Sequence, residues 1–337
     1  VVFVIYLPIL RAICEELELR QDDRLANALM LGQLFSSAIS CGMTPIAHVF
    51  PIMAIGFYQN ATGTSVSYIH YMAFAVPVGL LCFAAMLLLF RFVLRPDLSC
   101  VSRLDFDALK RSVTPADRRE KATLIIFFLV VAMWVLPEFI EPVLPAVATQ
   151  GTAFPPLVGA VALCLLSVGG APLMNFKEAM QKGVEWGSVI MAGATLALGS
   201  AMTNAEIGLT DWLSGAIAPT LNGLPVWLLI LVFTVWAAVM TNVASNMVTV
   251  TVVCAVAIPL CMASGGAVST PAIAMIIGML ASYAFVTPPA HPNVPLAIGS
   301  GWTKTGQVIL YGTILMVISI VVTVAVGYPI ASALMGA

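Results

Sequence analysis

The chain has 337 residues, of which 61% are hydrophobic and only 9% are charged, and its formal net charge at pH 7 is −2. A soluble domain carries roughly 25% charged residues, so this composition excludes an ordinary water-soluble protein. The sequence opens with VVFVIYLP, without Met and inside an apolar segment, and it lacks the charged start of a signal peptide. We therefore expect the protein to begin upstream of Val1.

Apolar runs recur along the chain and approach or reach the roughly 20 residues that a membrane-spanning helix needs. Such runs occupy residues 68–90, 122–142, 189–202, 226–240 and 308–326. A barrel would instead show strands of about ten residues that alternate apolar and polar, a pattern that this sequence lacks. The sequence therefore predicts an all-α polytopic membrane protein in contact with lipid.

The first interruption of a long apolar stretch is the sequence TPIAH at residues 44–48. Proline removes a backbone donor and disfavours the α conformation of the residue before it, so a helix should unwind here. Unwound backbone inside a membrane is tolerated only where protein or a water-filled cavity satisfies it. A single turn of this kind is more often a kink with a packed histidine than a binding site.

Basic residues concentrate in one segment, since eight of the fourteen Lys and Arg lie between Arg91 and Lys121. The positive-inside rule therefore predicts that residues 95–121 form a cytoplasmic loop, and the sequence RLDFDALKR within it suggests a short amphipathic helix. Spans counted outward from this loop place every remaining Lys and Arg on the inner side. We expect a multi-pass protein of the inner or plasma membrane.

Residues 225–261 form two apolar arms around the polar centre TNVASN at 241–246. This segment is either one long tilted helix or a re-entrant hairpin with its tip near the middle of the membrane. Neither flank carries a basic residue, which favours the hairpin. Ser-Asn at a helix end is often only a cap, and Thr241 and Asn242 are equally suited to holding the hairpin or to binding a ligand.

The TPIAH sequence has an echo, TPPAH at residues 287–291. Each copy follows a similar apolar run, and each is preceded by an apolar segment with a proline, Pro8 in one case and Pro259 in the other. The predicted topology makes the two copies enter the membrane from opposite sides. Paired broken helices in opposed repeats are a strong pointer to the binding site of a transporter, so for two turns we favour a site.

We accordingly expect inverted repeats with a re-entrant hairpin and broken helices. Residues 1–94 form the later part of the first repeat, residues 95–121 the polar loop, and residues 122–337 the second repeat. The second repeat should contain the hairpin at 225–261, a broken helix at 272–304 and a final helix at 307–330.

The hairpin and the turn behind it resemble the divalent anion/sodium symporter family, also known as sodium:sulfate symporters and solute-carrier dicarboxylate transporters. Members carry two Ser-Asn-Thr hairpin tips, each followed by a broken helix with a Thr-Pro-Pro-like turn. Here Ser245-Asn246 matches the second tip, and the Gly-Ser-Gly sequence at 299–301 follows the break. The resemblance covers essentially the whole chain and is strongest from residue 184 to residue 312. It implies that the first tip lies upstream of Val1.

Two departures bear on the substrate that the resemblance implies. Met247 stands where the family usually has Thr, and His48 and His291 stand at turn positions where it also usually has Thr. These changes leave the fold expectation intact but put the usual substrate of the family in doubt.

The resemblance implies that Na⁺, as coupling ion, binds between a hairpin tip and the unwound turn behind it. Hard cations take oxygen ligands. The expected ligands, partly from backbone carbonyls, are Asn246, Ser245 and Ala290 at one site and Gly42 and Thr44 at the other.

The anion should bind between the tips, held by hydroxyl and amide donors and by helix N-termini. Protonated histidines would add positive charge. The candidate residues for the anion are Ser245, Asn246, Thr287, Thr44, His48, His291, Pro292 and Asn293.

The family resemblance predicts sodium-coupled symport of a small divalent anion, such as a dicarboxylate, tricarboxylate or sulfate, by an elevator mechanism in a homodimer. A cation/proton antiporter is the alternative, although such a protein normally needs an acidic residue at mid-depth and none is visible. An enzyme is not expected, because two histidines and an asparagine make a poor metal site. We expect no catalytic residues and no nucleic-acid partner.

Overall fold

The computed structural model describes residues 2–21, 23–103, 117–136, 154–183 and 225–336, together with a few residues between 184 and 224. It divides into two compact units, one made of residues 1–104 with 192–337 and the other of residues 105–191. Helices dominate both units. The described residues include only two strands, each of two residues, so the all-α class is confirmed.

The larger unit opens with α1 (Val2–Glu16), α2 (Arg24–Gly42), α3 (Val49–Thr62), α4 (Tyr68–Leu89), η1 (Phe90–Leu94) and η2 (Ser99–Arg103). It continues with α13 (Val226–Val243), α14 (Asn246–Ala263), α15 (Thr270–Leu280), α16 (Asn293–Gly299), α17 (Thr305–Val322), η4 (Thr323–Gly327) and α18 (Tyr328–Met335). Among the described residues, five helical segments are long and apolar enough to cross a membrane. They are Arg24–Gly42, Tyr68–Leu94, Val226–Val243, Asn246–Ala263 and Thr305–Met335.

Side-chain caps fix where several of these helices begin. The Asp23 carboxylate accepts a hydrogen bond from the Leu25 amide at 2.7 Å before α2, and the Ser67 hydroxyl accepts one from the His70 amide at 3.2 Å before α4. The first amides of a helix have no partner within the helix, so such caps stabilise its start.

Helical structure stops at both Thr-Pro turns. α2 ends at Gly42 and α3 begins at Val49, whereas α15 ends at Leu280 and α16 begins only at Asn293. The backbone is therefore non-helical around each proline, in line with the donor that proline removes. The second break, at 281–292, is the longer of the two.

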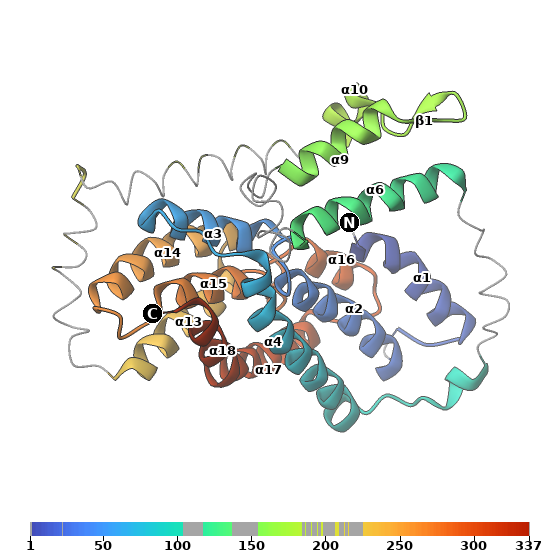
Figure 1. Cartoon of the computed structure of the whole chain (residues 1–337). Helices are drawn as coiled ribbons and strands as arrows, with labels where there is room; N and C mark the ends of the chain where they lie inside the picture. The colour runs from blue at the N-terminus through green and yellow to red at the C-terminus, as the bar shows by residue number, and fades with distance from the viewer. Residues whose placement is uncertain are drawn as a thin grey trace. The chain divides into compact units, whose positions relative to one another are not determined.

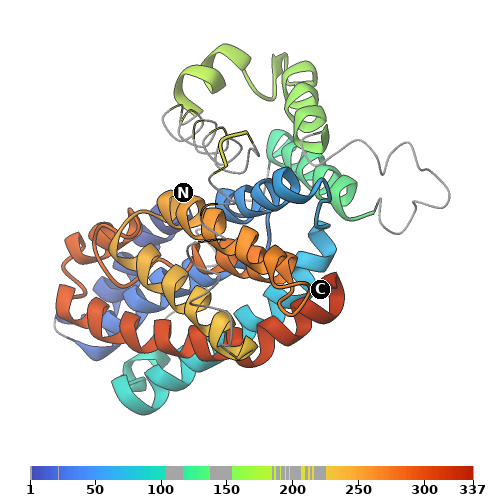
Figure 2. The ribbon, with the colours of Figure 1, turned by 90° about the vertical axis from the view of Figure 1, so that its left-hand side faces the viewer.

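The later part of each broken helix packs on the earlier part of the other. α3 contacts α14 and α15, and α16 contacts α1 and α2, as the two ends of the unit in Figure 1 show. α13 and α14 are joined by only two residues and lie side by side as a helical hairpin (Figure 2). The two halves of the chain are thus interleaved, which brings both breaks into one region.

The contact between α3 and α15 is unusually close at one glycine. A Cβ atom on Gly278 would lie 2.7 Å from the Cβ atom of Ala54 and 3.0 Å from the Cα atom of Pro51. Only a residue without a side chain fits between these backbones. This packing holds α3, the later part of the first broken helix, against α15, the earlier part of the second broken helix.

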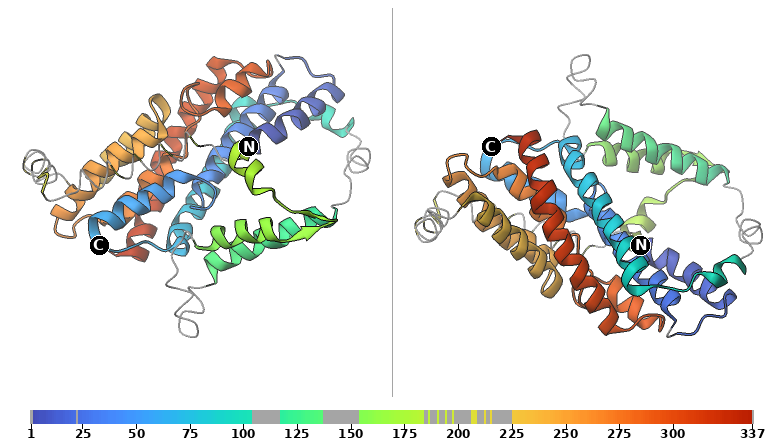
Figure 3. Two further views of the ribbon diagram at one scale, coloured as in Figure 1. Left: turned by 90° about the horizontal axis from the view of Figure 1, so that it is seen from above. Right: turned by 90° about the horizontal axis from the view of Figure 1, so that it is seen from below.

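The last helical stretch, from α17 to α18, packs against α4 and α15. α17 packs on α4, and α18 packs on both α4 and α15, so that α17, η4 and α18 run alongside α4 (Figure 3). Large apolar side chains such as Leu81 and Leu88 on α4 and Leu310 on α17 remain exposed. An apolar outer face of this kind suits contact with lipid.

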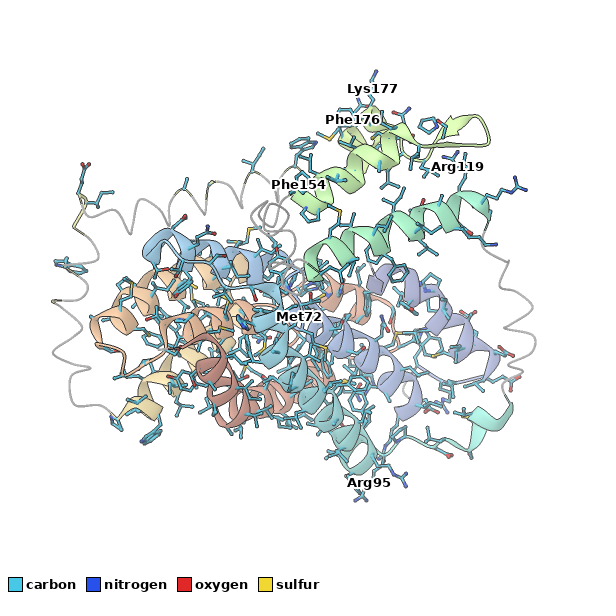
Figure 4. The ribbon with its side chains drawn as sticks, in the orientation of Figure 1. Met72, Arg95, Arg119, Phe154, Phe176 and Lys177 are labelled. Atoms are coloured by element: carbon cyan, nitrogen blue, oxygen red, sulfur yellow. The ribbon has the colours of Figure 1, made fainter. Side chains whose placement is uncertain are left out.

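The smaller unit contains α6 (Arg118–Val135), α9 (Phe154–Leu165), β1 (Ser167–Val168), β2 (Ala171–Pro172), α10 (Phe176–Glu178) and η3 (Ala179–Gly183). α6 starts with a reciprocal cap in which Asp117 accepts from the Glu120 amide and the Glu120 carboxylate accepts from the Asp117 amide. The Arg119 guanidinium donates to the carbonyls of Val168 at 3.0 Å and Pro172 at 2.6 Å, beside the β1–β2 turn (Figure 4).

Some predicted features fall outside the described residues. They include most of the expected amphipathic helix in the 95–121 loop, the end of the 122–142 span, and most of the 189–202 span.

Candidate functional site

The two Thr-Pro turns have the same local geometry. The Ala47 amide donates to the Thr44 carbonyl at 3.3 Å, and the Ala290 amide donates to the Thr287 carbonyl at 3.0 Å. Each is a four-residue turn closed by a bond from its fourth residue to its first, with proline at the second position, where its fixed φ is favourable. The sequence echo therefore corresponds to a repeated backbone structure.

The structure brings these two turns together. The ring centroids of His48 and His291 lie 6.2 Å apart. His48 Nδ1 also forms a hydrogen bond of 2.9 Å with the hydroxyl of Ser282, a residue 234 positions later that is fully buried in the second break. Residues from the first quarter and the last quarter of the chain thus form one polar cluster inside an apolar bundle.

The hairpin tip consists of Ala244 and Ser245, between α13 and α14. Ser245 is exposed, has extended backbone angles, and makes no side-chain cap at the start of α14. Its carbonyl accepts from the Thr249 amide and hydroxyl at 2.8 and 2.9 Å. The Ser245 hydroxyl is therefore presented outward at the tip instead of being used as a helix cap.

Asn246 is buried behind the tip, with 7% of its surface exposed. The Thr241 hydroxyl lies 2.8 Å from Asn246 Oδ1 and 2.9 Å from the carbonyl of Ala281. A threonine hydroxyl has one proton and can donate to only one of these oxygens. Rotating the Asn246 amide lets its nitrogen donate to Thr241 and releases Oδ1, an orientation that hydrogen-bond logic permits equally well.

Asn242 ties the end of α13 to the second break. Its amide nitrogen donates to the carbonyls of Ala238 at 2.9 Å and Tyr283 at 3.0 Å, and its Oδ1 accepts from the amides of Phe285 and Val286, both at 2.9 Å. All four hydrogen-bonding positions of this side chain are thus filled by backbone groups. Of the two roles considered for Asn242, the geometry supports holding the structure.

The Thr287 and Thr44 hydroxyls are used differently. Thr287 donates its hydroxyl to the Asn242 carbonyl, so its only proton is used within the protein. Thr44 accepts from the Ile46 amide at 3.2 Å, which leaves its hydroxyl proton available to another group. The equivalent threonines of the two turns therefore differ in what they can offer a ligand.

The remaining candidates surround these turns. The Gly42 carbonyl accepts from the Tyr71 hydroxyl at 2.8 Å and keeps a second lone pair. Ala290 is buried, Pro292 is exposed, and Asn293 begins α16, with its amide donating to His291 Nδ1 at 3.1 Å. Oxygen atoms suited to a hard cation therefore exist at both turns.

Sequence reasoning missed Ser282 and Tyr71. Both are polar groups within apolar segments, ASYAFV and YIHYMAFAV, and a polar side chain in such a position is the signal that was available. Their partners, His48 and the Gly42 carbonyl, lie 234 and 29 positions away, so only the tertiary structure identifies them.

Residues 1–336 match the family model described as the sodium:sulfate symporter transmembrane region. Among similar proteins, the sodium-dependent dicarboxylate transporter SdcS of Staphylococcus saprophyticus is 23% identical, over 96% of this chain and 64% of its own length. The sodium-dependent high-affinity dicarboxylate transporter 3 of Caenorhabditis elegans is 28% identical, over 89% of this chain and 56% of its own. Human solute carrier family 13 member 1 is 30% identical over 142 residues, which are 42% of this chain and 23% of that protein.

The chain spans about two thirds of the length of the curated relatives that match it most fully. What the whole protein transports, and with which partners, is therefore a matter for proposal.

Proposed function

The chain belongs to the sodium:sulfate symporter family, and from this premise we propose that it transports a small divalent anion by sodium-coupled symport. The anion is a dicarboxylate, a tricarboxylate or sulfate. The named relatives include sodium-dependent dicarboxylate transporters, which supports the choice of both ions.

One observation carries this proposal. Two non-helical turns with the same hydrogen bond, from segments far apart in the chain, meet through His48 and His291. The second turn is bonded to the end of α13, beside the hairpin tip, through the Thr287 hydroxyl. Non-helical backbone and polar side chains are costly within a membrane and persist where they surround a binding site. Paired broken helices are typical of secondary transporters.

Two sodium sites are assigned, each between a hairpin tip and the turn behind it. Asn246 and Ser245, with the Ala290 carbonyl, are the ligands at one site, and the Gly42 carbonyl and Thr44 are ligands at the other. If the Asn246 amide is rotated, its nitrogen donates to Thr241 and its carbonyl oxygen, which contacts Thr241 in the structure, becomes free to bind Na⁺.

The anion is assigned to the space between the two hairpin tips. Ser245 is exposed at the second tip, and Thr44 in the first turn retains a hydroxyl proton. The α16 helix is too short for its N-terminus at Asn293 to bind an anion by itself. It contributes to the site through the turn residues that precede it.

Transport is proposed to follow an elevator mechanism. The interleaved broken helices and the α13–α14 hairpin form the moving block, and α4 with α17 and α18 forms a scaffold through which two copies pair. The loop at 95–121 is placed in the cytoplasm and the protein in the plasma or inner membrane.

Uptake into proteoliposomes tests the function. The full-length protein should accumulate labelled succinate, citrate or sulfate when an inward Na⁺ gradient is imposed, and a K⁺ gradient of the same size should give no accumulation. Uptake that is indifferent to Na⁺ would refute sodium coupling. Exchange of Na⁺ for protons without anion uptake would favour the antiporter alternative.

Crosslinking tests the elevator. A cysteine at Ser245 should form crosslinks to different depths of α4 under inward-facing and outward-facing conditions. A tip that keeps one depth relative to α4 throughout the cycle would rule out this mechanism while leaving the anion assignment untouched.

A further inference from the structure

The two histidines of the turns share a feature that their sequence positions do not show: in both rings Nδ1 is engaged by the protein. His291 Nδ1 accepts a hydrogen bond from the Asn293 amide at 3.1 Å. A backbone amide can only donate, so this nitrogen carries no proton in the neutral ring. The proton of neutral His291 must therefore reside on Nε2.

The same conclusion follows for His48 from its partner. Ser282 is fully buried, and its hydroxyl lies 2.9 Å from His48 Nδ1. In the described part of the chain, His48 is the one hydrogen-bond partner of the Ser282 hydroxyl. If Nδ1 donated to this oxygen, the serine proton would be left buried and unpaired, at a cost of about 1–3 kcal/mol. Ser282 therefore donates to Nδ1, and the proton of neutral His48 also resides on Nε2.

Both Nε2–H groups remain unused. Neither Nε2 atom has a hydrogen-bond partner among the described residues. In the described part of the chain, the side-chain nitrogen and oxygen atoms that are both buried and without a partner belong to Asn27, Tyr283 and Thr323. The two Nε2 atoms are not among them, so each is accessible from outside the protein. Two neutral N–H donors, held in one tautomer by two unrelated partners, thus lie where the turns meet.

We propose that His48 and His291 form a pair of fixed N–H donors for one oxyanion, a carboxylate or sulfate, and that Ser282 is the positioning residue that sets the tautomer of His48. The ring centroids are 6.2 Å apart, and an N–H···O⁻ bond is about 2.8 Å long, so one oxyanion can contact both rings. This inference rests on the proposed function and names how its site recognises the anion without a Lys or Arg.

Nitrogen NMR of the imidazole rings tests the tautomers directly. Full-length protein with ¹⁵N-labelled histidine rings, in bilayers near pH 8, should show a protonated Nε2 and a bare Nδ1 for both residues. The signals are assigned from the variants His48→Asn and His291→Asn. Ser282→Ala should change the His48 signals and leave those of His291 unchanged. A proton on Nδ1 of either wild-type ring would overturn the proposal.

Substitution by the two amides tests the donors. An asparagine side chain places a polar atom near the position of Nδ1 and is too short to place one at Nε2. A glutamine side chain is one carbon longer and places an N–H group near the position of Nε2. His48→Asn and His291→Asn should each raise the KM for succinate or sulfate about tenfold or more at saturating Na⁺, since a hydrogen bond to a charged group is lost. Each glutamine variant should raise the KM less than its asparagine partner.

His70→Asn is the matched control, because His70 is exposed on α4 and should leave the KM unchanged. Wild-type protein that shows no sodium-driven anion uptake would contradict the proposed function. Wild-type uptake with unaltered KM in both asparagine variants would instead refute the donor pair and leave the proposed function standing. If the asparagine variants do not fold, the glutamine variants assign the signals and the wild-type NMR spectrum decides.

Discussion

The Asn242 side chain offers the sharpest test of how the second break is held in place. Asn242→Leu keeps a side chain of similar size but removes both donors and both acceptors. The amides of Phe285 and Val286, on residues that are 0% and 6% exposed, then lose their partner. A buried unpaired group costs about 1–3 kcal/mol, so the two amides together should cost about 2–6 kcal/mol.

This cost falls on the break and not on the whole fold, because α13 and α15 keep their own helical hydrogen bonds. Even the lower limit of about 2 kcal/mol corresponds to a roughly 30-fold greater population of the opened segment, since about 1.4 kcal/mol is a factor of ten. Hydrogen–deuterium exchange of the peptide that covers residues 281–287 should accelerate by at least this factor. The protein in this assay is the full-length protein in nanodiscs.

Asn175→Leu is the matched control. Asn175 caps the short α10 through the Glu178 amide at 3.2 Å, on an exposed surface of the smaller unit, and its loss should leave exchange at 281–287 unchanged. If Asn242 were an anion ligand and did not hold the break, Asn242→Leu would raise the KM for the anion with exchange at the wild-type rate. That pattern would refute the structural role of Asn242.

Three further substitutions follow from the same contacts. Asn246→Ala should abolish sodium-dependent uptake, because water cannot replace a buried carbonyl ligand when the site is closed, and unchanged sodium dependence would remove Asn246 from the site. Gly278→Ala should destabilise the protein by about 1–3 kcal/mol and lower its melting temperature, since the new Cβ would meet the backbone of α3. Gly299→Ala is the control, because a Cβ at that position faces open space. Tyr71→Phe should cost about 1 kcal/mol through the lost bond to the Gly42 carbonyl, and a melting temperature equal to that of wild type would contradict this value.

The sequence by itself determined the class of the protein and the position of its irregular backbone. Hydropathy is a local property, and it located the helices now seen at Tyr68–Leu89 and Val226–Val243. The effect of proline is equally local, so the turns at 44–48 and 287–291 were recognisable as interruptions. Their echo and the Ser-Asn tip also indicated the family, and the family match over residues 1–336 confirmed it.

Only the tertiary structure decided which groups of the site are free and which are used within the protein. Whether Thr287 can donate to a ligand depends on the Asn242 carbonyl, 45 positions earlier, which takes its proton. One ring nitrogen of His48 is taken by Ser282, 234 positions later. A hydrogen-bond partner is chosen by packing between helices that are distant in the chain, and no local pattern records that choice, so the chemistry of the site emerged from the fold.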